Sequence, residues 1–131
     1  LNAFNENGWT LVIGTEYLTD LGRKLGVNCI GAAVYTEKRI YVSEASAVLH
    51  EFGHFLDCTM GFPQGHKDLY ALEAASAPMK QHAKSNSLEY FAEFFSYWLS
   101  GSTRTLAQLK ELTPETYAYF EELSADWIPL L

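Results

Sequence analysis

The feature that most constrains this chain is a pair of histidines, four residues apart, inside a segment with helical spacing of apolar residues. His50 and His54 belong to the string His-Glu-Phe-Gly-His, and on a helix of about 3.6 residues per turn both imidazoles face the same side, with Glu51 beside them. Apolar residues recur at helical spacing through segment 43–59, at Ala45, Val48, Leu49, Phe52, Phe55 and Leu56. The segment therefore predicts a buried helix that presents two metal ligands.

The predicted helix has recognisable ends. Ser43 gives a partial capping signal, and Glu44 in the first turn suits the helix dipole. Gly61 and Pro63 follow the apolar stripe and predict its end.

Two histidines do not complete a catalytic zinc site, which takes three protein ligands and keeps one position open for water. The continuation HExxHxxGxxH, which supplies a third histidine in one class of zinc peptidases, is excluded. Asp57 and Met60 stand where that pattern requires glycine and histidine. The third ligand must therefore come from another part of the chain.

A second helix, predicted over 87–100, offers that ligand. Its apolar residues repeat at spacings of three and four: Leu88, Phe91, Ala92, Phe95 and Leu99. Glu89 and Glu93 share one face, and buried carboxylates need a partner because an unpaired buried charge costs several kcal/mol.

We expect Asn86 or Ser87 to cap this second helix, which puts Glu89 in its first turn. We predict Glu89 as the third zinc ligand and Glu93 as the acceptor for the free ring N–H of a ligand histidine, His50. The reverse assignment of the two glutamates is the alternative.

Asp57 is a further candidate carboxylate, because it follows His54 by three residues. It is expected either to orient a ligand or the helix, or to be a solvated surface residue. His66 lies in a Gly- and Pro-containing stretch and is expected to be an ordinary exposed loop histidine.

These residues predict hydrolysis of a peptide bond. One Zn²⁺ lowers the pKa of a bound water toward about 7, and Glu51 can take its proton and pass it to the leaving amine. The small and β-branched stretch Ala32, Ala33, Val34, Tyr35 is expected to be an edge strand along which an extended peptide binds by strand addition.

The remaining pattern predicts an α+β fold in one domain, residues 1–131. A first strand is expected within 8–14, a helix over 15–25 that ends at Gly26, and a strand pair near 30–35 and 39–42. Further helices are expected over 67–77, 103–111 and 114–124, the last with Thr113 as cap and Pro114 in its first turn.

Composition excludes several classes of function. A formal net charge of −7 and the lack of a basic run argue against nucleic-acid binding, and no apolar run is long enough to span a membrane. Cys29 and Cys58 are either a disulfide or two free thiols. A start at Leu1 without methionine predicts a mature secreted protein or a domain cut from a longer exported one, and a monomer is expected.

The motifs HEFGHFLD and EYFAEFF resemble those of the anthrax lethal factor-like zinc metallopeptidases, a group that includes the bacterial Pro-Pro endopeptidases. The stretches GAAVYTEKRIYVSE and TPETYAYFEELSADWI are similar too, so the resemblance runs from about Gly31 onward. It implies a zincin-like fold of the gluzincin type. It also implies zinc held by His50, His54 and Glu89, with Glu51 as general base and acid.

The chain departs from that group at one position. The group carries a tyrosine seven residues before the ligand glutamate as a hydrogen-bond donor to the oxyanion, whereas this chain has His82. A histidine N–H can serve the same purpose, or His82 is an exposed loop residue. Tyr70 and Tyr90 are other candidate donors, although Tyr90 follows the ligand directly and should point away from the site.

Three functions are compatible with the sequence. The first is an active zinc endopeptidase. The second is a zinc-binding lethal-factor-like domain that has lost turnover and binds a protein, which the missing tyrosine would favour. The third is a zinc-dependent regulator that acts on one partner inside cells. The sequence leaves the substrate open, so a toxin protease, a Pro-Pro endopeptidase and a housekeeping peptidase are all possible.

Overall fold

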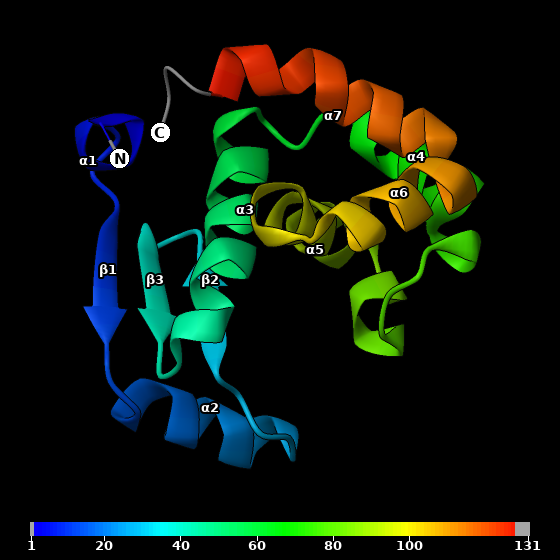
Figure 1. The fold of residues 1–131 in the computed structure, drawn as a ribbon. Helices are drawn as coiled ribbons and strands as arrows, with labels where there is room; N and C mark the ends of the chain where they lie inside the picture. The colour runs from blue at the N-terminus through cyan, green and yellow to red at the C-terminus, as the bar shows by residue number, and fades with distance from the viewer. Residues whose placement is uncertain (1, 128–131) are drawn as a thin grey trace.

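The computed structural model describes residues 2–127 and has the predicted α+β class. A small sheet stands beside a helical half, and helix α3 lies between them (Figure 1). The elements are α1 (Asn2–Glu6), β1 (Thr10–Ile13), α2 (Glu16–Leu25), β2 (Gly31–Val34), β3 (Arg39–Val42), α3 (Val48–Thr59), α4 (Gln64–Glu73), α5 (Ser87–Ser100), α6 (Thr103–Leu112) and α7 (Pro114–Trp127).

The sheet has three strands in the order β1-β3-β2. Strand β3 pairs in parallel with β1 and in antiparallel with β2, with Ala33 opposite Ile40 in the β2–β3 pair. Ile40 and Val42 in the central strand are buried, as expected for the strand that has a neighbour on each side. Strand β2 is therefore an edge strand of the sheet among the described residues.

Helices α3 and α5 cross in close contact at two small residues. A Cβ added to Gly53 would lie 2.7 Å from the Cα of Ala92. The two helix backbones are therefore closer at this point than a side chain at position 53 would allow. Gly53 lies between the two histidines, and Ala92 lies between Glu89 and Glu93. The crossing therefore brings the two motifs to one place.

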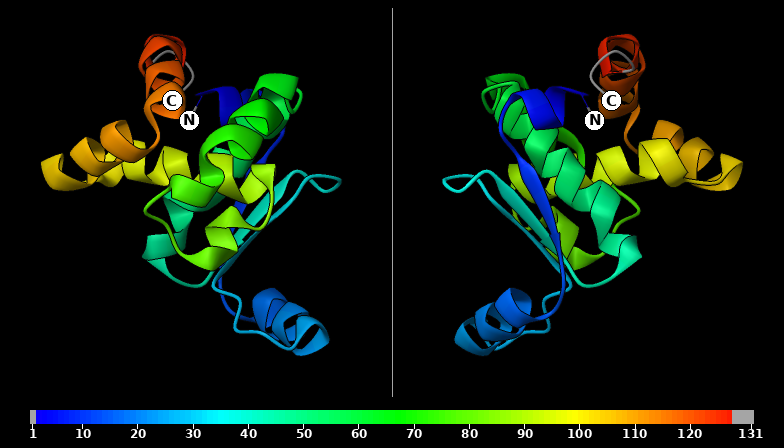
Figure 2. Two further views of the ribbon diagram at one scale, coloured as in Figure 1. Left: turned by 90° about the vertical axis from the view of Figure 1, so that its right-hand side faces the viewer. Right: turned by 90° about the vertical axis from the view of Figure 1, so that its left-hand side faces the viewer.

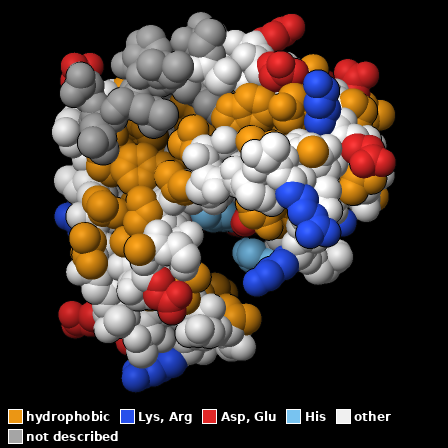
Figure 3. Space-filling view, in the orientation of Figure 1, with side chains coloured by type: hydrophobic (Ala, Val, Ile, Leu, Met, Phe, Trp, Pro, Cys, Tyr) orange, Lys and Arg blue, Asp and Glu red, His pale blue; other side chains and the backbone are white. Residues whose placement is uncertain are grey.

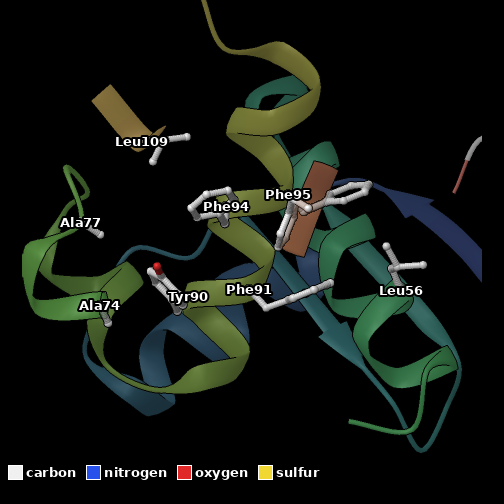
Figure 4. Packing of buried hydrophobic residues seen from close by; sticks show 9 residues of the cluster. Leu56, Ala74, Ala77, Tyr90, Phe91, Phe94, Phe95 and Leu109 are labelled. Carbon is white, nitrogen blue, oxygen red and sulfur yellow. The ribbon is translucent and has the colours of Figure 1, made fainter. Parts of the chain in front are cut away.

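The core is aromatic on both sides of α3. On the helical side, residues of α5 pack against neighbouring helices (Figure 4), and the buried cluster comprises Leu56, Ala74, Ala77, Tyr90, Phe91, Phe94, Phe95, Leu109 and Phe120. On the sheet side, Phe55 packs with Phe4 and Trp9 from the N-terminal segment. Helix α2 stands apart from the helical half, beyond the lower end of the sheet (Figure 2).

Several predicted boundaries were wrong by a turn. Helix α3 begins at Val48 after a single 3₁₀ turn at Ala45–Ala47, so Glu44 precedes the helix instead of occupying its first turn. Helix α4 begins at Gln64 and ends at Glu73, earlier than predicted. Leu99, expected in the buried stripe of α5, is 44% exposed.

The structure also bears on the two cysteines and on the possibility of a membrane span. Cys29 and Cys58 are free thiols, each partly exposed. None of the helices within residues 2–127 is both long and apolar enough to cross a membrane.

Candidate metal centre

Helices α3 and α5 bring three potential metal ligands together. His50 Nε2 lies 2.8 Å from Glu89 Oε2, and His54 Nε2 lies 3.3 Å from Glu89 Oε1. The ligand atoms of the three residues all lie within 4.8 Å of one another. Two ligand atoms on a tetrahedral zinc, each about 2.0–2.1 Å from the metal, are about 3.3 Å apart, so this donor set fits zinc in both chemistry and spacing.

The first turn of α5 positions Glu89. Asn86 caps the helix, because its side-chain oxygen accepts a hydrogen bond of 2.9 Å from the Glu89 backbone N–H. Of the two capping residues that the sequence allowed, Asn86 and Ser87, the structure shows Asn86. The carboxylate consequently projects from a fixed helix start toward the histidines of α3.

Glu93 lies one turn further along α5 and contacts the other nitrogen of His50. Its Oε2 is 2.9 Å from His50 Nδ1, which is the contact expected for a carboxylate that orients a ligand histidine. Burial opposes protonation of His50, but hydrogen bonds to Glu89 and Glu93 outweigh it and raise the pKa of His50 to about 10. Burial likewise opposes ionisation of Glu89, yet hydrogen bonds from His50 and His54 hold the pKa of that carboxyl well below its usual range.

Glu51 is buried beside the ligand histidines, only 6% exposed. The absence of a side chain at Gly31 makes room for it, because a Cβ there would lie 2.7 Å from Glu51 Oε1. Glu51 Oε2 has no hydrogen-bond partner among the described residues. Burial raises the pKa of Glu51, and the nearby His54 and His50 oppose that rise. A buried carboxylate oxygen without a partner, next to three potential ligands, suits a base that acts on a metal-bound water.

Tyr35, at the end of β2, is a contact that sequence reasoning missed. Its hydroxyl lies 3.1 Å from His54 Nδ1. Burial first, and then the carboxylates of Asp57 and Glu89, raise the pKa of this phenol, so it stays neutral. Tyr35 was predicted only as part of the substrate strand, because a contact between a strand end and a helix leaves no spacing signal in the sequence.

His82 lies at the edge of the site, in a 3₁₀ turn at Gln81–Lys84. Its side chain is 81% exposed, as expected of a loop residue, yet its Nε2 lies 3.4 Å from Glu89 Oε2. The two tyrosines named as alternative donors point elsewhere. The Tyr70 hydroxyl donates to the Lys84 carbonyl at 2.6 Å, and the Tyr90 hydroxyl lies 3.0 Å from Thr116 Oγ1.

Asp57 and His66 form a separate buried pair. Asp57 is 1% exposed and its Oδ1 lies 2.7 Å from His66 Nδ1, so the surface alternative for Asp57 was wrong. The expectation for His66 was also wrong, because this residue lies in α4, is 3% exposed and stacks on Phe91 with ring centroids 4.1 Å apart. The Tyr119 hydroxyl contacts the other ring nitrogen of His66 at 2.7 Å. Asp57 thus joins α3 to α4 instead of contacting a ligand histidine.

The potential ligands open onto a groove of about 840 Å³. Figure 3 shows histidine side chains in the hollow between α2 and the helical half. One wall is apolar and is formed by the edge strand β2 with Leu21, Leu25 and Val27, whereas Lys80 and His82 line the opposite wall. Such a groove can hold an extended chain against β2 while the metal ligands lie at its base.

Comparison with protein families gives one match. The model of the family described as "Anthrax toxin lethal factor, N- and C-terminal domain" matches residues 14–123. The match includes α2, which precedes the region where the sequence motifs first resemble that group. None of the curated proteins compared matches the chain. Since the matched region spans most of the chain, the protein belongs to the anthrax toxin lethal factor N- and C-terminal domain family.

Proposed function

We propose that this domain is a zinc-dependent endopeptidase with a zincin-like fold. One observation carries the proposal: His50, His54 and Glu89 converge within 4.8 Å at the base of an open groove, with Glu51 buried beside them and one of its oxygens unpartnered. The family description covers both an N-terminal and a C-terminal domain, so family membership alone does not imply catalysis. The residues named above carry the proposal.

His50, His54 and Glu89 would hold the zinc ion. Bound there, zinc supplies Lewis acidity that lowers the pKa of a coordinated water toward about 7. Glu51 then accepts a proton from the attacking water and returns it to the leaving amine. Its raised pKa suits both steps, because a carboxylate that holds a proton more tightly is a better base and is still an acid near neutral pH.

Strand β2 would orient the substrate. It is an edge strand and lines the groove, so its outward-facing backbone groups are free to pair with an extended peptide. A peptide bound in this way lies beside Glu51, because Gly31 of β2 is in contact with the Glu51 carboxylate.

His82 is the remaining candidate for stabilising the oxyanion. Its position on the wall of the groove, 3.4 Å from a ligand oxygen, supports that role, and its exposure gives it freedom to turn toward substrate. We expect His82→Ala to lower kcat about 100-fold, as loss of one oxyanion donor does in other hydrolases, with zinc content unchanged. The neighbouring exposed residue offers a control, Gln81→Ala, which should leave kcat unchanged. An unchanged kcat in His82→Ala would remove His82 from the mechanism.

The direct test of the proposal compares wild type with Glu51→Gln. Both proteins should bind one zinc, because Glu51 is not a ligand, and only wild type should cleave peptides from a broad library. Glu121→Gln, at an exposed position on α7, is the matched control and should cleave as wild type does. Cleavage by Glu51→Gln at the wild-type rate would refute the mechanism.

A second function is favoured by the presence of His82 where the related zinc peptidases carry a tyrosine. With histidine in place of the oxyanion tyrosine, the domain could bind zinc and a peptide without turning it over. Bound zinc and peptide in wild type, with no cleavage of any library member, would select this alternative over the endopeptidase.

A further inference from the structure

The two ligand histidines have different partners for their second ring nitrogen. His50 Nδ1 contacts the carboxylate of Glu93 from α5, at 2.9 Å. His54 Nδ1 contacts the phenol of Tyr35 from the end of β2, at 3.1 Å. Each ring therefore has a partner from a different part of the chain, a carboxylate for His50 and a phenol for His54.

The partner of Nδ1 decides whether an imidazole can bind a metal through Nε2. Neutral imidazole carries one proton, and Nε2 has a free lone pair only when that proton is on Nδ1. An oxygen that accepts a hydrogen bond from Nδ1–H favours this tautomer and fixes the plane of the ring. The Tyr35 hydroxyl oxygen can accept such a bond, and it lies within reach of His54 Nδ1.

Tyr35 is itself held firmly in place. Its ring makes edge contacts with Phe62, at 5.2 Å between centroids, and with Trp9, at 6.4 Å. These contacts come from the loop after α3 and from the segment before β1. A hydroxyl anchored by surrounding rings can restrict the orientation of His54, which a mobile side chain could not do.

The geometry excludes the oxyanion role for Tyr35. Its hydroxyl contacts Nδ1, whereas Nε2, the atom that faces Glu89, lies at the other end of the imidazole edge. The hydroxyl is thus behind the ligand ring relative to the metal position. Tyr35 does not replace the tyrosine that the family pattern would place at position 82.

We infer that Tyr35 is a positioning residue that holds His54 in the tautomer and orientation needed to bind zinc through Nε2. The inference rests on the proposed zinc site. Tyr35 directly follows β2, so the proposed substrate strand would also hold a residue that orients a potential metal ligand. A neutral phenol donates less electron density through the ring than a carboxylate does, so His54 should leave the zinc more acidic than a second Glu–His pair would.

The test compares two tyrosine-to-phenylalanine variants. Tyr35→Phe removes the hydroxyl from His54 and keeps the ring. Tyr119→Phe is the matched control, because it removes a hydroxyl that contacts a different buried histidine, His66, at 2.7 Å. The zinc Kd would be measured by chelator competition, and the visible spectrum of the cobalt-substituted protein would report ligand geometry.

We expect Tyr35→Phe to raise the zinc Kd about tenfold to a hundredfold and to change the cobalt spectrum. Tyr119→Phe should lower the Tm but leave both metal readouts unchanged. Wild-type affinity in Tyr35→Phe would overturn the inference, and so would an equal loss of affinity in both variants, since that would reveal a general effect on stability.

The same experiment separates this inference from the proposed function. If wild type binds no zinc, both fail. If wild type binds zinc and Tyr35→Phe binds it more weakly, but neither cleaves peptide, the inference stands and the endopeptidase proposal fails.

Discussion

At the scale of single residues, His50 is the most constrained side chain of the site. Its two ring nitrogens lie 2.8 and 2.9 Å from two different carboxylates. In the metal-free protein this arrangement raises its pKa to about 10, so the ring is protonated at neutral pH. A zinc ion bound as proposed would compete with that proton for Nε2.

We therefore predict that zinc binding at pH 7.5 releases about one proton from His50 and weakens as pH falls. Calorimetric titrations in buffers with different ionisation enthalpies would measure the proton count. A binding enthalpy that did not depend on the buffer would contradict the prediction.

The raised pKa of His50 also predicts how the stability of the metal-free protein changes with pH. Because folding raises the pKa of His50 above its ordinary 6.5, the stabilisation is fully present below pH 6.5 and is lost as pH rises toward about 10. Glu89 acts in the opposite direction, since its lowered pKa stabilises the fold above its ordinary 4.5 and that contribution is lost on acidification. Thermal melts of chelator-treated protein should therefore give the highest Tm between pH 4.5 and pH 6.5, where both contributions are present.

Residue identity and spacing predicted part of this site. Paired carboxylates on a buried helix face require a partner, and this requirement predicts the roles of Glu89 and Glu93 from the sequence alone. Tyr35 and His66 could not be assigned in this way, because neither carries a carboxylate on a predicted buried face that would require a partner. A Gly- and Pro-containing stretch also suggested a loop at His66, where tertiary packing holds a helix.

At the scale of elements, the crossing of α3 and α5 brings the potential metal ligands His50, His54 and Glu89 together. Gly53 permits the close approach, and the atoms nearest to an added Cβ belong to the backbone of Ala92, which cannot rotate away. The glycine between the two histidines thus has a packing reason in this fold.

We expect Gly53→Ala to destabilise the protein by about 1–3 kcal/mol, because α5 must move to accommodate the methyl group. Zinc affinity should fall as well, since α5 carries Glu89. Denaturant unfolding and chelator competition would measure the two effects.

Gly65→Ala is the matched control for that substitution. Gly65 lies in α4, and no atom lies within 4 Å of its added Cβ. Alanine there should be neutral or stabilising by up to about 1 kcal/mol, because it is the better helix former. Equal stability of the Gly53→Ala and Gly65→Ala variants would contradict the packing account.

Element type was predictable, and element ends were less so. The strand pair, α2 with Gly26 as its C-cap in the left-handed conformation, and the start of α7 at Pro114 all followed from local signals. The residue that contacts the first turn of α7 did not. Glu73 Oε1 accepts a 2.6 Å hydrogen bond from the Thr116 backbone N–H, a contact across 43 positions that no local pattern shows.

At the scale of the whole molecule, the groove is lined by the edge strand β2 and by the potential metal ligands on α3 and α5. The Ser43 backbone N–H donates to the Ile30 carbonyl at 3.0 Å. Because antiparallel pairing alternates, Ala32 and Val34 direct their backbone groups toward β3, and Ala33 directs its own outward. A bound peptide would pair with Ala33.

We predict that Ala33→Pro lowers kcat/KM by at least about tenfold through loss of the outward N–H, with zinc content unchanged. Proline is tolerated at such an edge position, so the fold should persist. Steady-state kinetics with one cleaved peptide would measure the effect, and full activity in Ala33→Pro would contradict strand addition.

Family membership supports the expectation of a secreted, toxin-related protein, and both secretion and the identity of the substrate stay predictions. The fold class was predictable from periodicity. The shape of the groove was not, because it depends on how α2 and the loop that carries Lys80 and His82 are placed against the sheet.

The most direct test of the central claim is a zinc titration of metal-free protein, with cleavage of a mixed peptide library as the readout. We expect cleavage to rise with added zinc and to saturate at one equivalent, and to be absent at every zinc concentration in Glu51→Gln. Saturable binding of one zinc by wild type, with no peptide cleaved, would contradict it.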